Sequence, residues 1–280
     1  MLKDFFKLNT PFEEFDSDRM DSQLKTSKHI INVLYRPDGL SLKKISNTIF
    51  ENVSLSKTKI EKCTFKNCMF KDCLFIGSNF TQVEFHGCQF INCNFFKSKF
   101  SGVYGKPNQF RLAIQNEFHS NIAVHLYHQL RENYYTESQR EFKNEAEYFF
   151  SKWKRKLLLF KAREDDQPLY KYGPSVFASF VYDILLGYGY RLRNLLISTS
   201  VLISALITLN HCYAKYLFIQ PESPSVIKSI YFTITTMATL GASGFSPLSE
   251  LGYGVVTINV LIGITVLTAT VNSIFRKIIR

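Results

Sequence analysis

A period of five residues governs the first third of the chain. Every fifth residue from position 40 to position 100 is Leu, Ile or Phe: Leu40, Ile45, Phe50, Leu55, Ile60, Phe65, Phe70, Phe75, Phe80, Phe85, Phe90, Phe95 and Phe100. The positions two residues earlier, from 48 to 98, hold only small or β-branched residues: Thr48, Val53, Thr58, Cys63, Cys68, Cys73, Ser78, Val83, Cys88, Cys93 and Ser98. A period of five fits neither a single helix nor a single strand, so it predicts a repeat architecture.

Residues two apart lie on the same side of an extended backbone, so both periodic positions can face the inside of a narrow coil. The stretch Cys63-Thr64-Phe65-Lys66-Asn67 and its neighbours resemble the pentapeptide-repeat family. This resemblance implies a right-handed quadrilateral β-helix over residues 38–104, in which four repeats make one turn and residues twenty apart stack. Residues 1–37 carry no signal that predicts their structure.

Five of the six cysteines occupy the small inward position of the repeat, so we expect them to behave as buried hydrophobic residues. A spacing of five is not a zinc spacing, and no structural metal or cofactor is predicted. Cys68 and Cys88, or Cys73 and Cys93, would stack within bridging distance, but a cytosolic location would keep them reduced.

The middle of the chain, residues 105–170, is predicted to be a cytoplasmic α-helical hairpin that covers the end of the β-helix. No Pro or Gly occurs from position 109 to 161, apolar residues recur at helical spacing, and polar residues interrupt the pattern around 135–138. His125 and His128 lie one helical turn apart without a third ligand at a matching spacing, so an ordinary surface pair is favoured over a metal site.

The basic residues between 152 and 163 favour a solvated surface or contact with the inner leaflet over nucleic-acid binding, although the net charge of +11 permits either partner.

Two charge-free segments near the end of the chain, residues 194–214 and 251–275, are long enough to cross a bilayer. We predict spans at 194–216 and 252–275. A third charge-free segment, 229–249, contains many hydroxyl groups, glycines and a proline, and cannot cross as a regular helix. Irregular backbone at membrane depth is tolerated where it lines a cavity, so a short helix and a re-entrant loop are predicted over 225–245.

Basic residues give the orientation of these spans. They precede the first span and follow the second, at Arg191, Arg193, Arg276, Lys277 and Arg280. Both termini are therefore expected to be cytoplasmic, in a multi-pass protein of the cell (inner) membrane, and the start of the chain does not resemble a signal peptide. An apolar stripe after Pro174 predicts an interfacial amphipathic helix over 174–190.

The segment Thr235–Pro247 resembles the pore loop of two-span potassium channels, whose filter reads T-V-G-Y-G. Without a gap, Thr239, Leu240 and Gly241 match the first three filter positions in type, Ala242 replaces the tyrosine and Ser243 replaces the second glycine. The resemblance covers residues 191–280 and implies a pore helix and filter at 225–245. It implies an all-α two-span pore domain that assembles as a homotetramer and conducts a monovalent cation, K⁺ first, with selectivity relaxed by the altered filter.

The same resemblance assigns three further positions on the second span. Gly263 lies twenty residues after Ser243, where the gating-hinge glycine of that family falls. Thr265 and Thr268 are candidates for lining the inner cavity, although their hydroxyl groups could equally bond back to the helix backbone.

Other classes of function remain to be weighed against a channel. A two-helix membrane anchor that carries a β-helix scaffold, without conduction, is the alternative. Mimicry of nucleic acid needs an acidic surface, whereas lysines dominate residues 40–104. No catalytic motif occurs in a suitable setting, so an enzyme is not predicted. The β-helix is expected to serve as a regulatory or docking module for a cytoplasmic protein or ligand.

Overall fold

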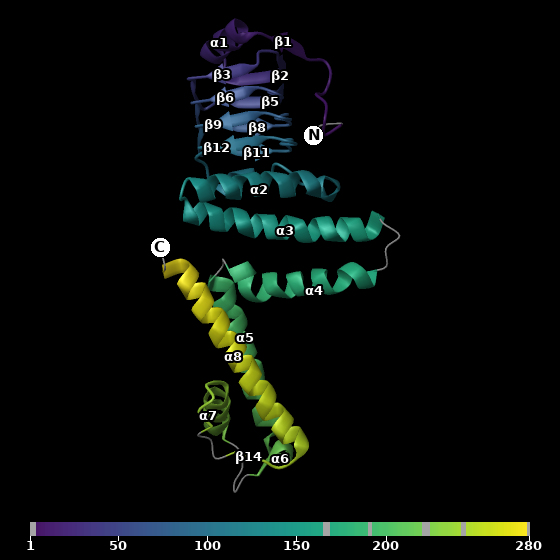
Figure 1. Ribbon diagram of the computed structural model, residues 1–280, viewed down its shortest axis with the longest axis vertical. Coiled ribbons are helices and arrows are strands. Elements are labelled where there is room, and N and C mark those ends of the chain that lie inside the picture. The colour runs from purple at the N-terminus through teal and green to yellow at the C-terminus, as the bar shows by residue number, and fades with distance from the viewer. Residues whose placement is uncertain (1–3, 165–168, 190–191, 220–224, 242–244, 279–280) are drawn as a thin grey trace. The chain divides into compact units, whose positions relative to one another are not determined.

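The computed structural model describes residues 4–164, 169–189, 192–219, 225–241 and 245–278. The chain folds as two compact units, residues 1–177 and 178–280, and Figure 1 shows the elements of each. The first unit is a stack of short parallel strands followed by helices, and the second unit is helical.

Parallel strands of the first unit form three walls of a coil. One sheet stacks β1 (Glu13–Phe15), β2 (His29–Tyr35), β5 (Ile49–Ser54), β8 (Met69–Lys71) and β11 (Gln89–Ile91). A second sheet holds β4 (Lys44–Ser46), β7 (Thr64–Lys66) and β10 (Glu84–His86). A third holds β3 (Gly39–Ser41), β6 (Lys59–Glu61), β9 (Asn79–Thr81) and β12 (Lys99–Ser101). Single bridges between Ser54, Leu74 and Asn94 form the fourth wall.

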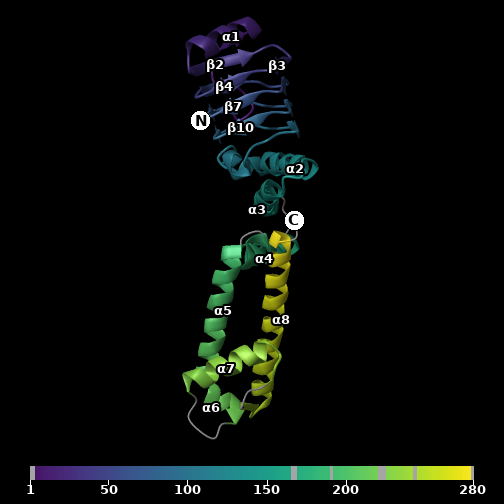
Figure 2. The same ribbon diagram turned by 90° about the vertical axis from the view of Figure 1, so that its left-hand side faces the viewer.

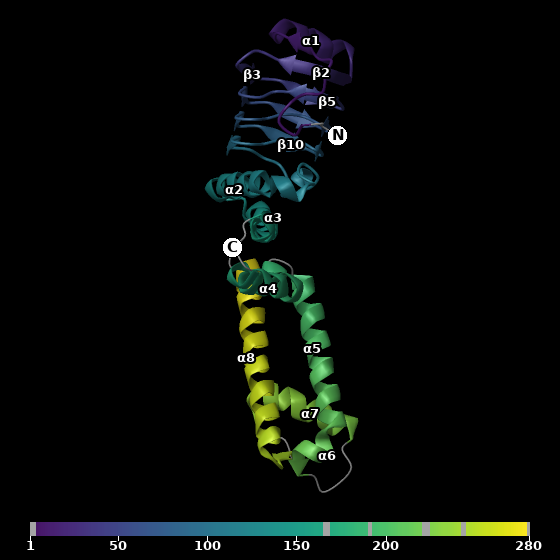
Figure 3. The ribbon, with the colours of Figure 1, turned by 90° about the vertical axis from the view of Figure 1, so that its right-hand side faces the viewer.

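Residues paired across these strands are twenty positions apart, as in Phe50, Phe70 and Phe90. Four five-residue repeats therefore make one coil, consistent with a β-helix. Figure 3 shows the strands of successive coils lying one above another.

Stacked phenylalanine rings fill the interior of the coil. Phe70 stacks on Phe50 and on Phe90, each at 4.9 Å between ring centroids, and Phe110 continues the column at 4.5 Å from Phe90. The small positions are also buried, and those that hold Cys or Ser donate to carbonyl groups of the preceding coil, as Ser78 Oγ does to Leu55 O at 2.6 Å. The cysteines follow the same pattern, so their role is to fill the narrow interior and satisfy backbone carbonyls.

The corner of each repeat lies two residues after the large apolar position. These corner residues have left-handed backbone: Leu42, Asn47, Asn52, Lys57, Lys62, Asn67, Asp72, Gly77, Gln82, Gly87, Asn92, Lys97 and Gly102. Asn and Gly are common among them because they adopt this conformation at the lowest steric cost. One such residue per repeat turns the chain onto the next wall.

The coil is longer than residues 38–104. At its start, Ile30 and Tyr35 continue the five-residue period as buried residues, and Ile30 pairs with Phe50 in register. At its end, Phe110 enters the aromatic column from the 3-10 helix η1 (Pro107–Phe110). Gly105 stands where the period requires an apolar side chain, and a Cβ there would lie 3.2 Å from Phe85 Cβ.

The residues before the coil form an arm and a short helix. The arm, residues 4–12, lies against the coil: Asn94 donates to Phe5 O at 2.7 Å, and Asn9 exchanges two hydrogen bonds with the Asn52 side chain. Phe5 also stacks on His119, whose pKa is lowered by burial. Helix α1 (Ser17–Thr26) connects β1 to β2, and the side chain of Asp16 caps its start.

Two helices cover the last coil. These are α2 (Ser120–Thr136) and α3 (Arg140–Glu164), with a break at 137–139, and the short 3-10 helix η2 (Glu117–His119) precedes them. The buried Asn133 side chain accepts from Val103 N–H at 2.9 Å and donates to Val103 C=O at 2.8 Å. Tyr134 Oη donates to Gly105 O beside it, and burial raises the pKa of this tyrosine. The Asn133 amide thus replaces the backbone of the coil that would come next.

The second unit contains two long helices and a short one between them. After α4 (Leu169–Leu186), which crosses the boundary between the units, and η3 (Gly187–Gly189), the elements are α5 (Leu192–Cys212), α6 (Ala214–Leu217), β13 (Phe218–Ile219), α7 (Val226–Met237), β14 (Ser246–Pro247) and α8 (Glu250–Ile278). Figures 2 and 3 both show α7 between α5 and α8, toward the end of the pair where α6 lies.

Several of these bounds differ from the expected ones, and α8 (Glu250–Ile278) extends beyond the predicted span 252–275 at both ends. The interfacial helix was predicted to begin at Pro174, but α4 begins at Leu169 and contains this proline. The first span was predicted to run to 216, but its helix ends at Cys212 and a separate turn of helix follows Tyr213.

Replacing Asn133 with Ala leaves the buried Val103 N–H and C=O without partners. We expect this to cost about 2–4 kcal/mol in the repeat domain and to speed hydrogen–deuterium exchange of the Val103 amide in the full-length protein. Asn121→Ala on the same helix is the matched control, because Asn121 is exposed and its side chain bonds only the adjacent Ile122 N–H within the part of the chain that the structure describes. Equal exchange at Val103 in both variants would contradict this role of Asn133.

Thiol labelling tests the packing of the coil. Of six cysteines, Cys212 alone is exposed, and burial raises the pKa of Cys63 and Cys93, which keeps these thiols protonated and unreactive. N-ethylmaleimide should therefore add once to the folded protein and six times in denaturant, as measured by mass spectrometry. Cys212→Ser should add none when folded. Labelling of a second thiol under native conditions would show that the coil opens.

Candidate functional site

Two helices of the second unit are long and apolar enough to cross a membrane. They are Arg193–Cys212, with mean hydropathy 1.7, and Glu250–Phe275, with mean hydropathy 2.0. Large apolar side chains on both are exposed in the single chain, including Val201, Leu261 and Leu267. Surface of this kind needs lipid or other subunits to cover it.

Helix α7, between these two helices, is specified at both ends. The Ser225 side chain caps its start by accepting a backbone N–H at 3.3 Å. At the other end, Thr239 N–H donates to Thr236 O at 3.0 Å and Leu240 N–H donates to Thr235 O at 2.9 Å. This pair of bonds is the Schellman motif, which ends a helix at a left-handed residue.

The segment after α7 has unusual backbone geometry. Thr239 closes the Schellman motif with φ of 60°, a position normally taken by Gly, and a β-branched residue there is strained. Gly241 also has φ of 60°, and Leu240 between them is 71% exposed. Left-handed residues break the alternation of carbonyl directions that an extended strand imposes. Of the predicted filter, Ala242 and Ser243 lie outside the described residues.

An aromatic cluster lies between α7, β13 and the residue that follows the loop. Phe232 of α7 is buried against Phe218 at 4.8 Å and against Phe245 at 4.9 Å between ring centroids. Val255 and Val256 of α8 complete this cluster. Phe232 precedes the predicted filter and Phe245 follows it, so the cluster joins the segments on either side of the predicted filter. The sequence offered a signal for these residues, namely aromatic side chains that flank a hydroxyl-rich segment, but it was not recognised.

Three buried polar side chains connect α5, α7 and α8. Asn210 Nδ2 donates to Thr233 Oγ1 at 2.9 Å, and Asn259 Nδ2 lies 3.4 Å from Asn210 Oδ1. Beside them, His211 Nδ1 lies 3.1 Å from the buried Ser229 Oγ. Sequence reasoning missed these residues too. Asparagines inside apolar spans were the available signal, because polar groups are costly at that depth.

Gly263 packs against α7 in this structure. A Cβ at this position would lie 2.6 Å from Met237 Cα and closer still to its carbonyl oxygen. The glycine therefore permits α8 to touch the backbone at the end of α7. Helix α8 is continuous through this position.

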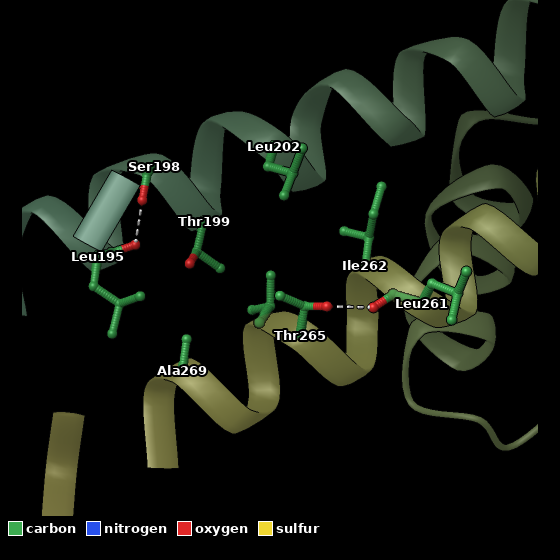
Figure 4. A pocket seen from close by; sticks show the side chains of 9 residues that line it. Leu195, Ser198, Thr199, Leu202, Leu261, Ile262, Thr265 and Ala269 are labelled. Atoms are coloured by element: carbon green, nitrogen blue, oxygen red, sulfur yellow. Dashed lines mark hydrogen bonds between the residues drawn. The ribbon is translucent and has the colours of Figure 1, made fainter. Parts of the chain in front are cut away.

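The two predicted cavity-lining threonines have different surroundings. Figure 4 shows Thr265 facing α5 across a cavity of about 250 Å³, opposite Thr199 and Leu202. Its hydroxyl donates to Leu261 O at 2.8 Å, so it bonds back to its own helix. Thr268 is exposed on α8 and does not line this cavity.

Other polar clusters of the chain give no metal site among the described residues. His128 Nδ1 lies 3.1 Å from Arg131, while burial and then the charge of His128 lower the pKa of His125. Within the basic run, Lys156 and Arg163 pair with Glu117 at 3.5 and 3.7 Å.

Comparisons with known families agree with this geometry. Residues 196–280 match the family model described as ion channel, and residues 62–102 match pentapeptide repeats in eight copies. The chain joins a pentapeptide-repeat domain to an ion-channel domain. Both families are in general non-enzymatic, and the channel domain with its two apolar helices indicates a membrane protein whose permeant species are cations.

No curated protein matches the chain. Among solved structures, the crystal structure of the pentapeptide repeat protein Rfr23 from the cyanobacterium Cyanothece 51142 is similar at 16% identity, with a TM-score of 0.12. The match covers 29% of this chain and 58% of that one, so the chain spans less than two thirds of the length of that protein.

Substitution of Gly263 tests the close packing of the channel domain. Gly263→Ala should push α7 away from α8, because the added methyl group overlaps the Met237 backbone, and should lower stability by about 1–3 kcal/mol. Gly254→Ala on the same helix is the control, because none of the described residues lies within 4 Å of a Cβ there. Thermal unfolding in detergent measures both. Equal melting temperatures would contradict the close contact between Gly263 and the Met237 backbone.

Proposed function

We propose that the chain is one subunit of a cation channel in which four copies surround a common axis and the loop after α7 lines the pore. The observation that carries this proposal is a short helix, between two apolar helices, that ends in the strained, exposed segment Thr239–Gly241. A single copy supplies one quarter of a ring of carbonyl groups, so conduction requires a closed assembly.

The electrostatics of this segment favour cations. The carboxyl end of α7 carries a partial negative charge, and its axis ends at Ala238, directly before Thr239. In the proposed assembly the Thr239 hydroxyl and the carbonyl groups of Thr239, Leu240 and Gly241 replace part of the hydration shell of the ion. Ala242 and Ser243 are proposed to complete the filter, and K⁺ is the proposed permeant ion.

The filter sequence supports relaxed selectivity among cations. Gly in the last filter position would give backbone freedom that Ser243 lacks, and Ala242 cannot brace the filter as an aromatic residue does. The aromatic cluster of Phe218, Phe232 and Phe245 is proposed to take over part of that bracing from within the subunit.

The remaining parts of the chain are proposed to serve the channel. The re-entrant loop would enter from the outside, since basic residues at Arg193 and beyond Phe275 favour a cytoplasmic position for both termini. Exposed Phe177, Phe180 and Ile184 on α4 support an interfacial helix. The pentapeptide-repeat domain, proposed to be right-handed, would then be a cytoplasmic regulatory or docking module.

Bilayer recordings of the purified protein test conduction. The wild type should carry current that reverses near the K⁺ potential in a KCl gradient, and Gly241→Ala should reduce the unitary conductance because Ala is disfavoured at φ of 60° by about 1–2 kcal/mol. Gly254→Ala, at an open site on α8, is the control. Native mass spectrometry in nanodiscs should give four subunits. A stable assembly without current would favour a membrane-anchored scaffold.

A further inference from the structure

A chain of buried hydrogen bonds crosses the channel domain from α5 through α7 to α8. Its members are Asn210, Thr233 and Asn259, and no more than 1% of any of them is exposed. Asn210 occupies the centre: its Nδ2 lies 2.9 Å from Thr233 Oγ1 and its Oδ1 lies 3.4 Å from Asn259 Nδ2. Each of the three helices contributes one side chain, so the three meet at one level.

The hydrogen bond between Asn210 and Thr233 determines which atoms donate and which accept in this series of bonds. The single hydroxyl proton of Thr233 is donated to Ser229 O at 2.8 Å, so Thr233 Oγ1 must accept from the Asn210 amide group. Asn210 Oδ1 then faces Asn259, which must present its own amide group. Exchanging the oxygen and nitrogen of either asparagine side chain, by rotating its amide group through 180°, would bring two donors or two acceptors together. The three side chains therefore act as one unit.

A second contact between α7 and α8 lies one helical turn further along. Gly263 is four residues after Asn259, and Met237 is four residues after Thr233, so each pair lies on one face of its helix. The missing side chain of Gly263 lets α8 touch the Met237 backbone. Two contacts at different heights fix both the rotation of α7 and its position along α8.

Displacement of α7 would break this arrangement abruptly. Buried hydrogen-bonding groups that lose their partners at membrane depth find no water to replace them. Asn259 Oδ1 is already buried without a hydrogen-bond partner among the described residues, so the site has no spare partner to offer. Helix α7 consequently has one favoured position, and this position also determines where Thr239 lies, because Thr239 directly follows the end of the helix.

We infer that Asn210, Thr233 and Asn259 are positioning residues that set the geometry of the Thr239–Gly241 segment and thereby the discrimination among cations. This inference rests on the proposed channel function. The residues do not touch the ion path; they act through α7, which ends at the first filter residue. In place of an aromatic side chain beside the filter, the subunit holds the preceding helix by hydrogen bonds.

Reversal potentials under opposed K⁺ and Na⁺ solutions test this role in the full-length protein. Thr233→Val and Asn259→Leu preserve the shape of each side chain but remove its hydrogen bond to Asn210. Each should change the K⁺ to Na⁺ permeability ratio by about threefold or more. The double variant should change it no more than the larger single change, because the residues act as one unit. Thr233→Ser, which keeps the hydroxyl group, should restore the wild-type ratio.

The control is Thr257→Val, because Thr257 is exposed on α8 and, among the described residues, its hydroxyl bonds only Tyr253 O of the same helix. A wild type that assembles but passes no cation would overturn the channel and the positioning role together. A conducting wild type with Thr233→Val indistinguishable from Thr257→Val would overturn the positioning role alone. Failure of both Thr233→Val and Asn259→Leu to assemble would also overturn it, in favour of a folding role.

Discussion

Hydrogen-bonding groups removed from water must be paired, and both units of this protein are arranged around that requirement. In the repeat domain each coil satisfies the backbone of the previous one, and the Cys and Ser side chains of the interior bond further carbonyl groups, as Cys93 Sγ does with Phe70 O at 3.3 Å. In the channel domain the same requirement acts on a few side chains, since lipid offers no hydrogen bonds. The amide group of Asn133 pairs buried polar groups at the end of the coil, and that of Asn210 pairs them between helices of the channel domain.

The repeat could be predicted from the sequence because each turn places its residues in the same environment as the last. Because every fifth position has the same surroundings, the same residue types recur there, and the period can be read from the sequence. The twenty-residue register follows because four repeats, one for each wall, make one coil. The ends could not be predicted in this way. Tyr35 departs from the Leu, Ile and Phe pattern, Gly105 interrupts it, and Phe110 reaches the column from a 3-10 helix. The arm at residues 4–12 bonds individual side chains and has no period.

The channel domain shows a similar division. The helix at 226–237 could be predicted because Ser225 is a cap residue and the hydroxyl-rich segment beyond it carries glycine, and both signals are local. Contacts between separate helices produce no local sequence pattern from which they could be predicted. The partnership of Asn210 with Asn259 joins residues 49 positions apart, and the packing of Gly263 on Met237 depends on where α7 lies. The resemblance to a channel predicts a hinge at Gly263, and what the structure shows at this position is a close contact with the Met237 backbone.

The twenty-residue register has a consequence for how this chain can change over evolutionary time. A duplicated or deleted block of twenty codons within the repeats would add or remove one complete layer, and every aromatic column, corner residue and terminal cap would find the same neighbours as before. A block of any length that is not a multiple of five would rotate the pattern out of phase. Natural variants of this domain should therefore differ in height far more readily than in cross-section.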